Sequence, residues 1–308
     1  MTPDKYTLSE SVLDVGDGHQ LYVQDWGNQA AMKPIVFLHG GPGGSTRDSH
    51  KASFDPTEQR VIFFDQRGCG RSLPLGSLDH NTTDDLVEDI EKIARHLNLE
   101  TFIVNGGSWG SCLALAYGLA HPERVAALVL RGIFTGSRSE IDWTDSGEFQ
   151  TFFPDVWDQY LAATPLEYRD APSKYHFERI AGADADAAKQ SAYAYQRLEG
   201  SISKLDDRFT PEPFETYDPT SIRIETHYLQ HGCFMPDNYI LDNAARLTMP
   251  VWLVQGRYDM VCPPIAAYKL HKALPNGQLV WTINGHRAEH EAATILKLVL
   301  QQIGAGQA

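Results

Sequence analysis

Apolar and polar positions along the first 135 residues alternate between two patterns. The first pattern consists of short runs that are almost continuously apolar, as expected for strands buried on both faces of a sheet. These runs are Leu21–Val23, Ile35–Leu38, Val61–Phe64, Phe102–Val104 and Ala127–Leu130. The second pattern has helical spacing and fills the stretches between several of these runs. Strand followed by helix, repeated, predicts a doubly wound, mostly parallel sheet of the α/β class.

Two of the intervening segments have clear helical limits. Asp85–Leu97 places its apolar residues on one stripe, and Thr82 or Thr83 precedes it as a capping residue. Ser111–Ala120 is almost entirely apolar or small and stops just before Pro122. We therefore expect a crossover helix after the third and after the fourth predicted strand.

The pattern changes near Thr135. Residues 136–245 are rich in aromatic and acidic residues, have helical spacing with few strand-like runs, and are divided by several prolines. We predict that they form a helical cap domain inserted into the sheet domain. The first pattern then returns with Val251–Val254, Gln278–Thr282 and an amphipathic helix over Glu291–Ile303. The core domain is thus predicted to comprise residues 1–135 and 246–308.

Composition narrows the class of protein. The chain has 308 residues, of which 42% are hydrophobic and 21% charged, typical of a globular protein. Its net charge of −14 disfavours nucleic acid or an anionic membrane as a partner. We expect no transmembrane helix, since no apolar run approaches 18 residues, and no secretory signal in the opening MTPDKYTLSE. Four scattered cysteines without a CxxC pair favour the cytoplasm, and the oligomeric state stays open.

The segment Gly106-Gly107-Ser108-Trp109-Gly110 has the form G-x-S-x-G. It follows a predicted strand and opens a predicted helix, which is the setting of a nucleophile elbow. Glycines are needed there because the turn leaves no room for side chains beside the serine. An incidental serine in a glycine-rich loop is the alternative, but the flanking elements favour Ser108 as a nucleophile.

A serine hydroxyl needs a base, and the base needs an acid that orients it. On a doubly wound sheet the expected order along the chain is Ser, Asp, His. Asp259 follows the strand Val251–Val254, and His286 follows the next strand-like run. Both lie beyond the carboxyl ends of strands, where such sheets place their sites. We therefore predict Ser108, Asp259 and His286 as a catalytic triad.

A glycine-rich loop, residues 39–44 with the sequence HGGPGG, follows the strand Ile35–Leu38. Such a loop lets backbone N–H groups approach a reacting oxygen closely. We assign the oxyanion hole to the N–H groups of Gly41 and Trp109. A flexible turn and a phosphate-binding loop are the alternatives, although the loop lacks the Lys-[Ser/Thr] ending of a Walker motif.

Residues 286–290, His-Arg-Ala-Glu-His, also match the inverted zinc-peptidase pattern H-x-x-E-H. On one helix face the two histidines would bind zinc. Against this, Gly285 suits a loop better than a helix interior, and Glu291 is the only acid after His290. We expect no metal and no organic cofactor.

Taken together, the motifs resemble those of the prolyl aminopeptidases, or proline iminopeptidases, of the α/β-hydrolase fold. The resemblance covers nearly the whole chain. Its marks are residues 39–43 (HGGPG), 65–72 (DQRGCGRS), 106–111 (GGSWGS), 256–259 (GRYD) and 285–286 (GH). By that resemblance, Ser108, Asp259 and His286 match the family's triad, and Gly41 and Trp109 match its oxyanion hole.

The resemblance also implies substrate-binding residues. The family recognises a free N-terminal amine with acidic residues of the cap, and Glu199 and Glu225 lie in segments similar to those that carry them. A buried ammonium needs carboxylate partners, although most glutamates of so acidic a chain are solvated. Phe134 and Cys262 match positions that line the proline pocket; ordinary core packing is the alternative for both.

The expected function is a serine exopeptidase that releases an N-terminal residue, preferably proline, from short peptides through an acyl-enzyme. The main alternative is a general esterase or amidase of the same fold with relaxed specificity. A dehalogenase or epoxide hydrolase is disfavoured, because those enzymes carry Asp where this chain has Ser108. A binding protein that kept the fold without catalysis is disfavoured by the complete Ser, Asp and His set.

Overall fold

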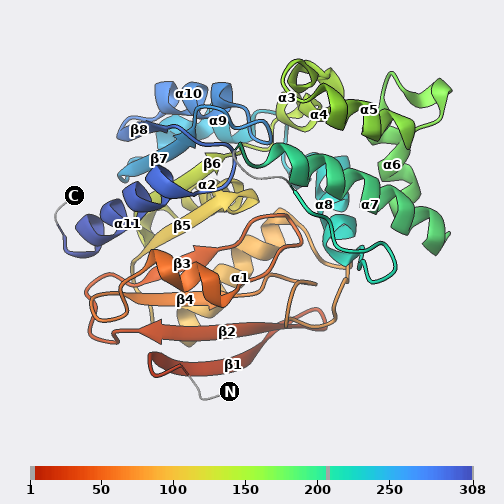
Figure 1. The fold of residues 1–308 in the computed structure, drawn as a ribbon. Coiled ribbons are helices and arrows are strands. Elements are labelled where there is room, and N and C mark those ends of the chain that lie inside the picture. The colour runs from red at the N-terminus through yellow and green to blue at the C-terminus, as the bar shows by residue number, and fades with distance from the viewer. Residues whose placement is uncertain (1–3, 206–208, 307–308) are drawn as a thin grey trace.

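A twisted sheet of eight strands lies at the centre of the computed structural model, which describes residues 4–205 and 209–306 (Figure 1). Its order is β1-β2-β4-β3-β5-β6-β7-β8, with β1, β2 and β4 antiparallel to one another in turn and the other neighbours parallel. The strands are β1 (Thr7–Gly16), β2 (His19–Gly27), β3 (Ile35–Leu38), β4 (Arg60–Phe64), β5 (Phe102–Ser108), β6 (Val125–Ile133), β7 (Val251–Gly256) and β8 (Gly277–Thr282). The predicted α/β class with a mostly parallel sheet is confirmed.

Helices cover both faces of the sheet, which explains why its central strands are mostly apolar. One face packs against α1 (Thr83–His96), α2 (Trp109–Ala120) and α10 (Pro264–Ala273). The other packs against α11 (His290–Gly304) and the 3-10 helix η1 (Asp48–Ser53). The start of α1 has the predicted cap, since the Thr82 hydroxyl accepts the N–H of Asp85 while the Asp85 carboxylate accepts the N–H of Thr82.

Two elements were not predicted from the sequence, β1 and α10. Strand β1 lies at the edge of the sheet, and most of its side chains are exposed or half-buried. Its sequence therefore lacks the apolar run that marks the central strands. Helix α10 begins at Pro264, directly after its N-cap residue Pro263, and the fixed φ of proline suits the first position of a helix.

The segment between β6 and β7 consists, in its described part, of helices and the loops that join them, and it lies over the carboxyl ends of the central strands (Figure 1). Its α-helices are α3 (Arg138–Ile141), α4 (Trp143–Ser146), α5 (Pro154–Ala162), α6 (Pro172–Ala181), α7 (Ala185–Ile202), α8 (Thr220–Gln230) and α9 (Tyr239–Asn243). The same segment contains the short 3-10 helices η3 (Glu148–Thr151), η4 (Leu166–Tyr168), η5 (Gly232–Phe234) and η6 (Ala244–Arg246). Another, η2 (Pro122–Arg124), lies between α2 and β6. The division into a core domain and a cap domain at residues 135/136 and 245/246 stays a prediction.

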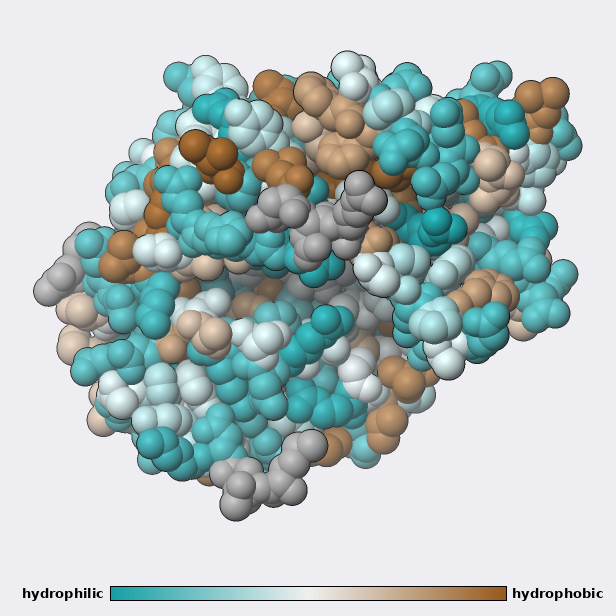
Figure 2. All heavy atoms as spheres, in the orientation of Figure 1, coloured by the Kyte–Doolittle hydropathy of each residue, from teal (hydrophilic) through white to brown (hydrophobic). Residues whose placement is uncertain are grey.

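Hydrophilic residues dominate the face of the molecule seen in Figure 2, and this face is hollowed near its centre. Among the described residues, no helix has the length and apolar character needed to cross a membrane.

Candidate active site

Ser108 lies at the junction of β5 and α2, in a backbone conformation with φ of 57° and ψ of −129° that a residue with a side chain rarely adopts. Close packing of the backbone holds it there. A Cβ atom at Gly106 would lie 2.2 Å from the carbonyl oxygen of Gly110, and one at Gly110 would lie 2.2 Å from that of Leu38. Only glycine fits at either position. The structure thus has the strand, the tight turn and the helix that the sequence predicts around Ser108.

The buried Asp259 and the partly exposed His286 form an acid–base pair. Asp259 follows β7 and His286 follows β8, and the Nδ1 atom of His286 lies 2.9 Å from Oδ2 of Asp259. The other carboxylate oxygen accepts the backbone N–H groups of Val261 and Cys262, at 3.0 and 2.8 Å. A histidine that donates from Nδ1 to a carboxylate keeps Nε2 unprotonated as a base. Ser108 and His286 line the same cavity.

Gln255 supports this pair, although nothing in the sequence singled it out. Its side-chain amide donates to Oδ2 of Asp259 at 3.2 Å and to the carbonyl of Cys262 at 3.0 Å. Its amide oxygen accepts the backbone N–H of Ile133 at 2.7 Å. It thereby ties the end of β6 to the loop after β7. A glutamine at the end of an apolar run carries no local signal of such a role.

The two residues assigned to the oxyanion hole lie on either side of the serine. Gly41, with φ of 119°, lines the cavities next to Ser108. Trp109 is the first residue of α2, where the backbone N–H has no partner within the helix. Its indole is buried and donates to the side chain of Gln66 at 2.9 Å, so the Trp109 ring packs in the core.

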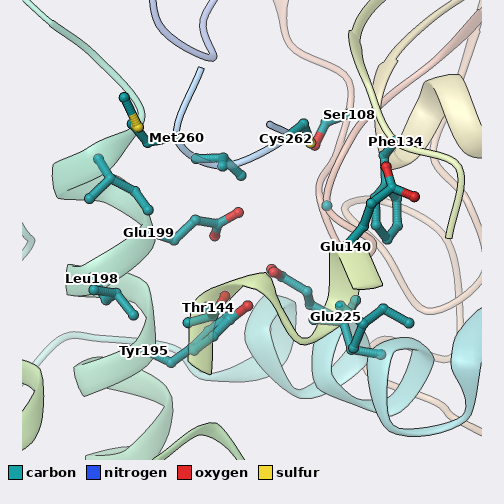
Figure 3. A pocket seen from close by; sticks show the side chains of 15 residues that line it. Ser108, Phe134, Glu140, Thr144, Tyr195, Leu198, Glu199, Glu225, Met260 and Cys262 are labelled. Atoms are coloured by element: carbon teal, nitrogen blue, oxygen red, sulfur yellow. The ribbon is translucent and has the colours of Figure 1, made fainter. Parts of the chain in front are cut away.

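A cavity of about 60 Å³ adjoins Ser108 beneath the helices of the cap (Figure 3). It is lined by all four predicted substrate-binding residues, Glu199, Glu225, Phe134 and Cys262. The structure thus brings these four residues together with Ser108 and Gly41, although they come from widely separated parts of the chain. Their roles in binding stay a prediction.

Glu199 on α7 and Glu225 on α8 extend into this cavity (Figure 3). Burial raises the pKa of Glu199, while His286 and Arg287 counteract the shift. Burial also raises the pKa of Glu225 well above its usual range, and the negative charge of Glu199 raises it further. Two carboxyl groups that repel each other in a buried site are stabilised when a cation binds between them.

The rest of the cavity wall was missed by the sequence analysis. It is mostly apolar or aromatic and includes Ile141, Tyr195, Leu198, Ile202, Leu229, Met260 and Val261. It also contains a third acid, Glu140, which accepts the N–H groups of Thr135 and Ser137 at 3.0 and 3.1 Å and the Ser137 hydroxyl at 2.8 Å. The Ser-x-x-Glu spacing of a capping box was the available signal, and it indicates that Glu140 caps α3.

The pattern H-x-x-E-H is divided between a loop and a helix. His286 lies in the loop where it pairs with Asp259, whereas His290 is the first residue of α11. The two histidines therefore do not share a helix face. Within residues 4–205 and 209–306, no group of three or more His, Cys, Asp or Glu side chains is placed to hold a metal ion.

Structures of known proteins show the same fold. The chain is similar to an esterase from Exiguobacterium antarcticum, with a TM-score of 0.67 and 19% identity over 96% of this chain and 100% of the other. It is also similar to proline iminopeptidase of Mycobacterium smegmatis, with a TM-score of 0.62 and 20% identity over 97% and 98% of the two chains.

Comparison of the sequence with those of known proteins identifies the family more narrowly than the fold does. A family model described as the α/β hydrolase fold matches residues 33–287. A probable proline iminopeptidase of Leptolyngbya boryana is 41% identical over 94% of this chain and 91% of its own length. Proline iminopeptidase of Xylella fastidiosa is 40% identical over 96% of both chains. On this similarity over nearly the full length, the chain belongs to the proline iminopeptidase family of α/β hydrolases.

Proposed function

We propose that the protein is a serine exopeptidase that removes one N-terminal residue, preferably proline, from short peptides. The family supports hydrolysis of a peptide bond, since the relatives are named proline iminopeptidases. The observation that carries the proposal is the small cavity beside Ser108, in which two buried carboxyl groups face a space of about 60 Å³. A space of that size, with acids in its wall, suits a single compact residue that carries a positive charge.

The proposed reaction begins with attack of the Ser108 hydroxyl on the first peptide carbonyl of the substrate. His286 takes the hydroxyl proton on Nε2, and Asp259 stabilises the resulting imidazolium through Nδ1. The backbone N–H groups of Gly41 and Trp109 hold the negative oxygen of the tetrahedral intermediate. His286 then gives its proton to the leaving amine, and the C–N bond breaks.

The second half of the reaction frees the N-terminal residue. The residue is held as an ester on Ser108, and a water molecule attacks that ester while His286 takes a proton from the water. Collapse of the second tetrahedral intermediate releases the amino acid and returns the proton to Ser108. No step requires a metal or an organic cofactor.

Glu199 and Glu225 determine where the peptide is cut. They bind the free ammonium group of the substrate, a secondary ammonium in the case of proline, with charge-assisted hydrogen bonds. Because these two acids anchor the amine inside the small cavity beside Ser108, only one residue fits between this anchor and Ser108. Phe134 and Cys262 lie in the wall against which the proline ring would pack. The substrate is thus a small peptide with a free N-terminus, and four unpaired cysteines support a cytoplasmic location.

A panel of amino-acid arylamides, each free and N-acetylated, tests the proposal. We expect the proline arylamide to be the best substrate and its N-acetylated form to be inert. Ser108→Ala should abolish turnover. Glu199→Gln and Glu225→Gln should each lower kcat/KM on the free amine by about tenfold or more, because each removes a charge-assisted hydrogen bond.

The same panel distinguishes the alternative function. Failure to hydrolyse proline arylamide, combined with hydrolysis of simple acyl esters, would indicate a general esterase or amidase. In that case the two glutamine variants would retain their activity on N-blocked esters. Failure of a serine-directed phosphonate to label Ser108 would exclude both hydrolase functions.

A further inference from the structure

A second, much larger cavity meets the small one at Ser108. It has a volume of about 660 Å³ and shares Gly41, Ser108, Glu199 and Glu225 with the small cavity. It extends from α7 past His286 to the space between η1 and α11. If the N-terminal residue occupies the small cavity, the rest of the peptide lies in this one.

The two cavities differ in charge. The wall of the small cavity contains three glutamates and no lysine or arginine. The large cavity is lined by Arg47, Arg131 and Arg287. The acid found only in the large cavity, Glu289, is already paired with Lys204 at 3.1 Å. Apart from the two shared glutamates and the paired Glu289, the charged residues of the large cavity are these three arginines, in a chain whose net charge is −14.

Among the described residues, several arginines are paired with a carboxylate, but these three are not. Arg60, Arg67, Arg71 and Arg124 each pair with a carboxylate at 2.7 to 3.0 Å. Within the described part of the chain, Arg47, Arg131 and Arg287 form no ion pair. An arginine that lines a cavity without an anion keeps N–H donors available for a ligand.

Arg131 lies deepest of the three. A Cβ atom at Gly107 would lie 2.5 Å from its Nε, and its Nη1 donates to the carbonyl oxygen of His286 at 3.2 Å. Its guanidinium is therefore packed against the residue before Ser108 and against the catalytic-loop backbone. Burial lowers its pKa, the negative charge of Asp259 counteracts this shift, and the nearby charge of Arg287 adds to it. A further anion bound next to Arg131 would offset the effects of burial and of Arg287.

We propose that Arg131, Arg287 and Arg47 bind the C-terminal carboxylate of the leaving peptide, so that the preferred substrates are very short peptides with both ends free. This inference rests on the proposed function and specifies its substrate class. The acids of the small cavity bind the positive end of the substrate, and the arginines of the large cavity bind its negative end. Since one residue spans at most about 3.6 Å, a carboxylate one or two residues beyond the scissile bond lies nearest to Arg131.

The test compares each peptide with its C-terminal amide, which removes one negative charge and changes little else. We expect the unmodified enzyme to hydrolyse Pro-Ala with a kcat/KM about three- to tenfold higher than Pro-Ala-amide, as expected for a charge-assisted hydrogen bond in a partly open cavity. High salt should reduce this ratio. In Arg287→Gln, Arg47→Gln and Arg131→Gln the ratio should fall towards one.

The ratio compares two substrates of the same variant. A general loss of activity therefore lowers both kcat/KM values equally and leaves the ratio unchanged. Arg287→Gln and Arg47→Gln change exposed side chains and keep the test valid if Arg131→Gln fails to fold. Arg95→Gln, which changes an exposed side chain of α1 that lines neither cavity, is the matched control and should retain the full ratio.

Two results would overturn the inference. One is a ratio near one in the unmodified enzyme, and the other is a ratio that all three arginine variants retain. Proline arylamide distinguishes these results from failure of the proposed function. If the enzyme cleaves the arylamide but ignores the C-terminal charge, only the carboxylate site is wrong; if it does not cleave the arylamide, the exopeptidase function itself is wrong.

Discussion

Both oxygens of the Asp259 carboxylate have assigned partners: one accepts two backbone N–H groups, and the other faces His286 and Gln255. Asp259→Asn keeps the shape of the side chain but replaces one accepting oxygen by an NH2 group that donates. If the amide oxygen still accepts the two N–H groups, its NH2 group faces His286 and forces the wrong tautomer. We expect kcat on proline arylamide to fall by roughly 10⁴-fold.

The exposed Asp79→Asn serves as the control for that measurement, since its side chain lies on the surface. Circular dichroism of both variants would show whether the fold is retained. Full activity of a folded Asp259→Asn variant would exclude Asp259 from the proposed triad.

The raised pKa of Glu225 has a consequence for stability. Between the usual carboxyl pKa and the raised one, the folded protein binds a proton at Glu225 that the unfolded chain has already released. Unfolding then releases a proton, so stability falls as pH rises through this range. Glu225→Gln removes the ionisable group, and we expect it to raise Tm at pH 8 more than at pH 5.

Thermal melts at the two pH values check this prediction, with the exposed Glu212→Gln as the control. A Glu225→Gln variant whose Tm changed equally at both pH values would show that the buried acid is not held in its protonated form.

At the scale of secondary-structure elements, Arg67 joins the loop after β4 to helix α1. Its guanidinium is almost fully buried and makes two hydrogen bonds to the Asp89 carboxylate, at 2.7 and 2.8 Å. Removing one partner of a buried pair leaves an uncompensated charge. We expect Asp89→Ala to lower the free energy of unfolding by about 3–5 kcal/mol.

The control for this prediction is Asp84→Ala on the same helix, where the side chain is exposed in the first turn. It should cost less than about 1 kcal/mol. Urea denaturation of both variants gives the comparison. Equal losses would mean that the charge of Asp89 contributes no more than a solvated carboxylate does.

The sequence predicts those elements whose own residues form a recognisable pattern. Central strands such as Ile35–Leu38 are apolar because helices cover both faces of the sheet. Ser108, Asp259 and His286 lie at or after strand ends in a motif order that could be recognised. Strand β1 lacks such a pattern because it is exposed at the edge. The role of Gln255 and the separation of two cavities depend on how distant elements pack, which no local pattern encodes.

At the scale of the whole molecule, the net charge of −14 gives the protein a negative electrostatic field. A proline arylamide carries one positive charge and is attracted by this field. We expect its kcat/KM to fall by roughly two- to tenfold between low salt and about 1 M salt, with little change in kcat. An uncharged ester provides the control, because salt should leave its kcat/KM nearly constant; an equal loss on both substrates would contradict electrostatic attraction.

The insertion of the cap between β6 and β7 separates the proposed nucleophile from its acid and base along the chain. A ribosome that adds about 5–20 residues per second needs between about 9 and 36 seconds to proceed from Ser108 to His286. Throughout that interval the elbow serine has no imidazole beside it. The nascent protein therefore carries an inert hydroxyl, and hydrolytic activity begins only after the last strand of the sheet has been translated and paired.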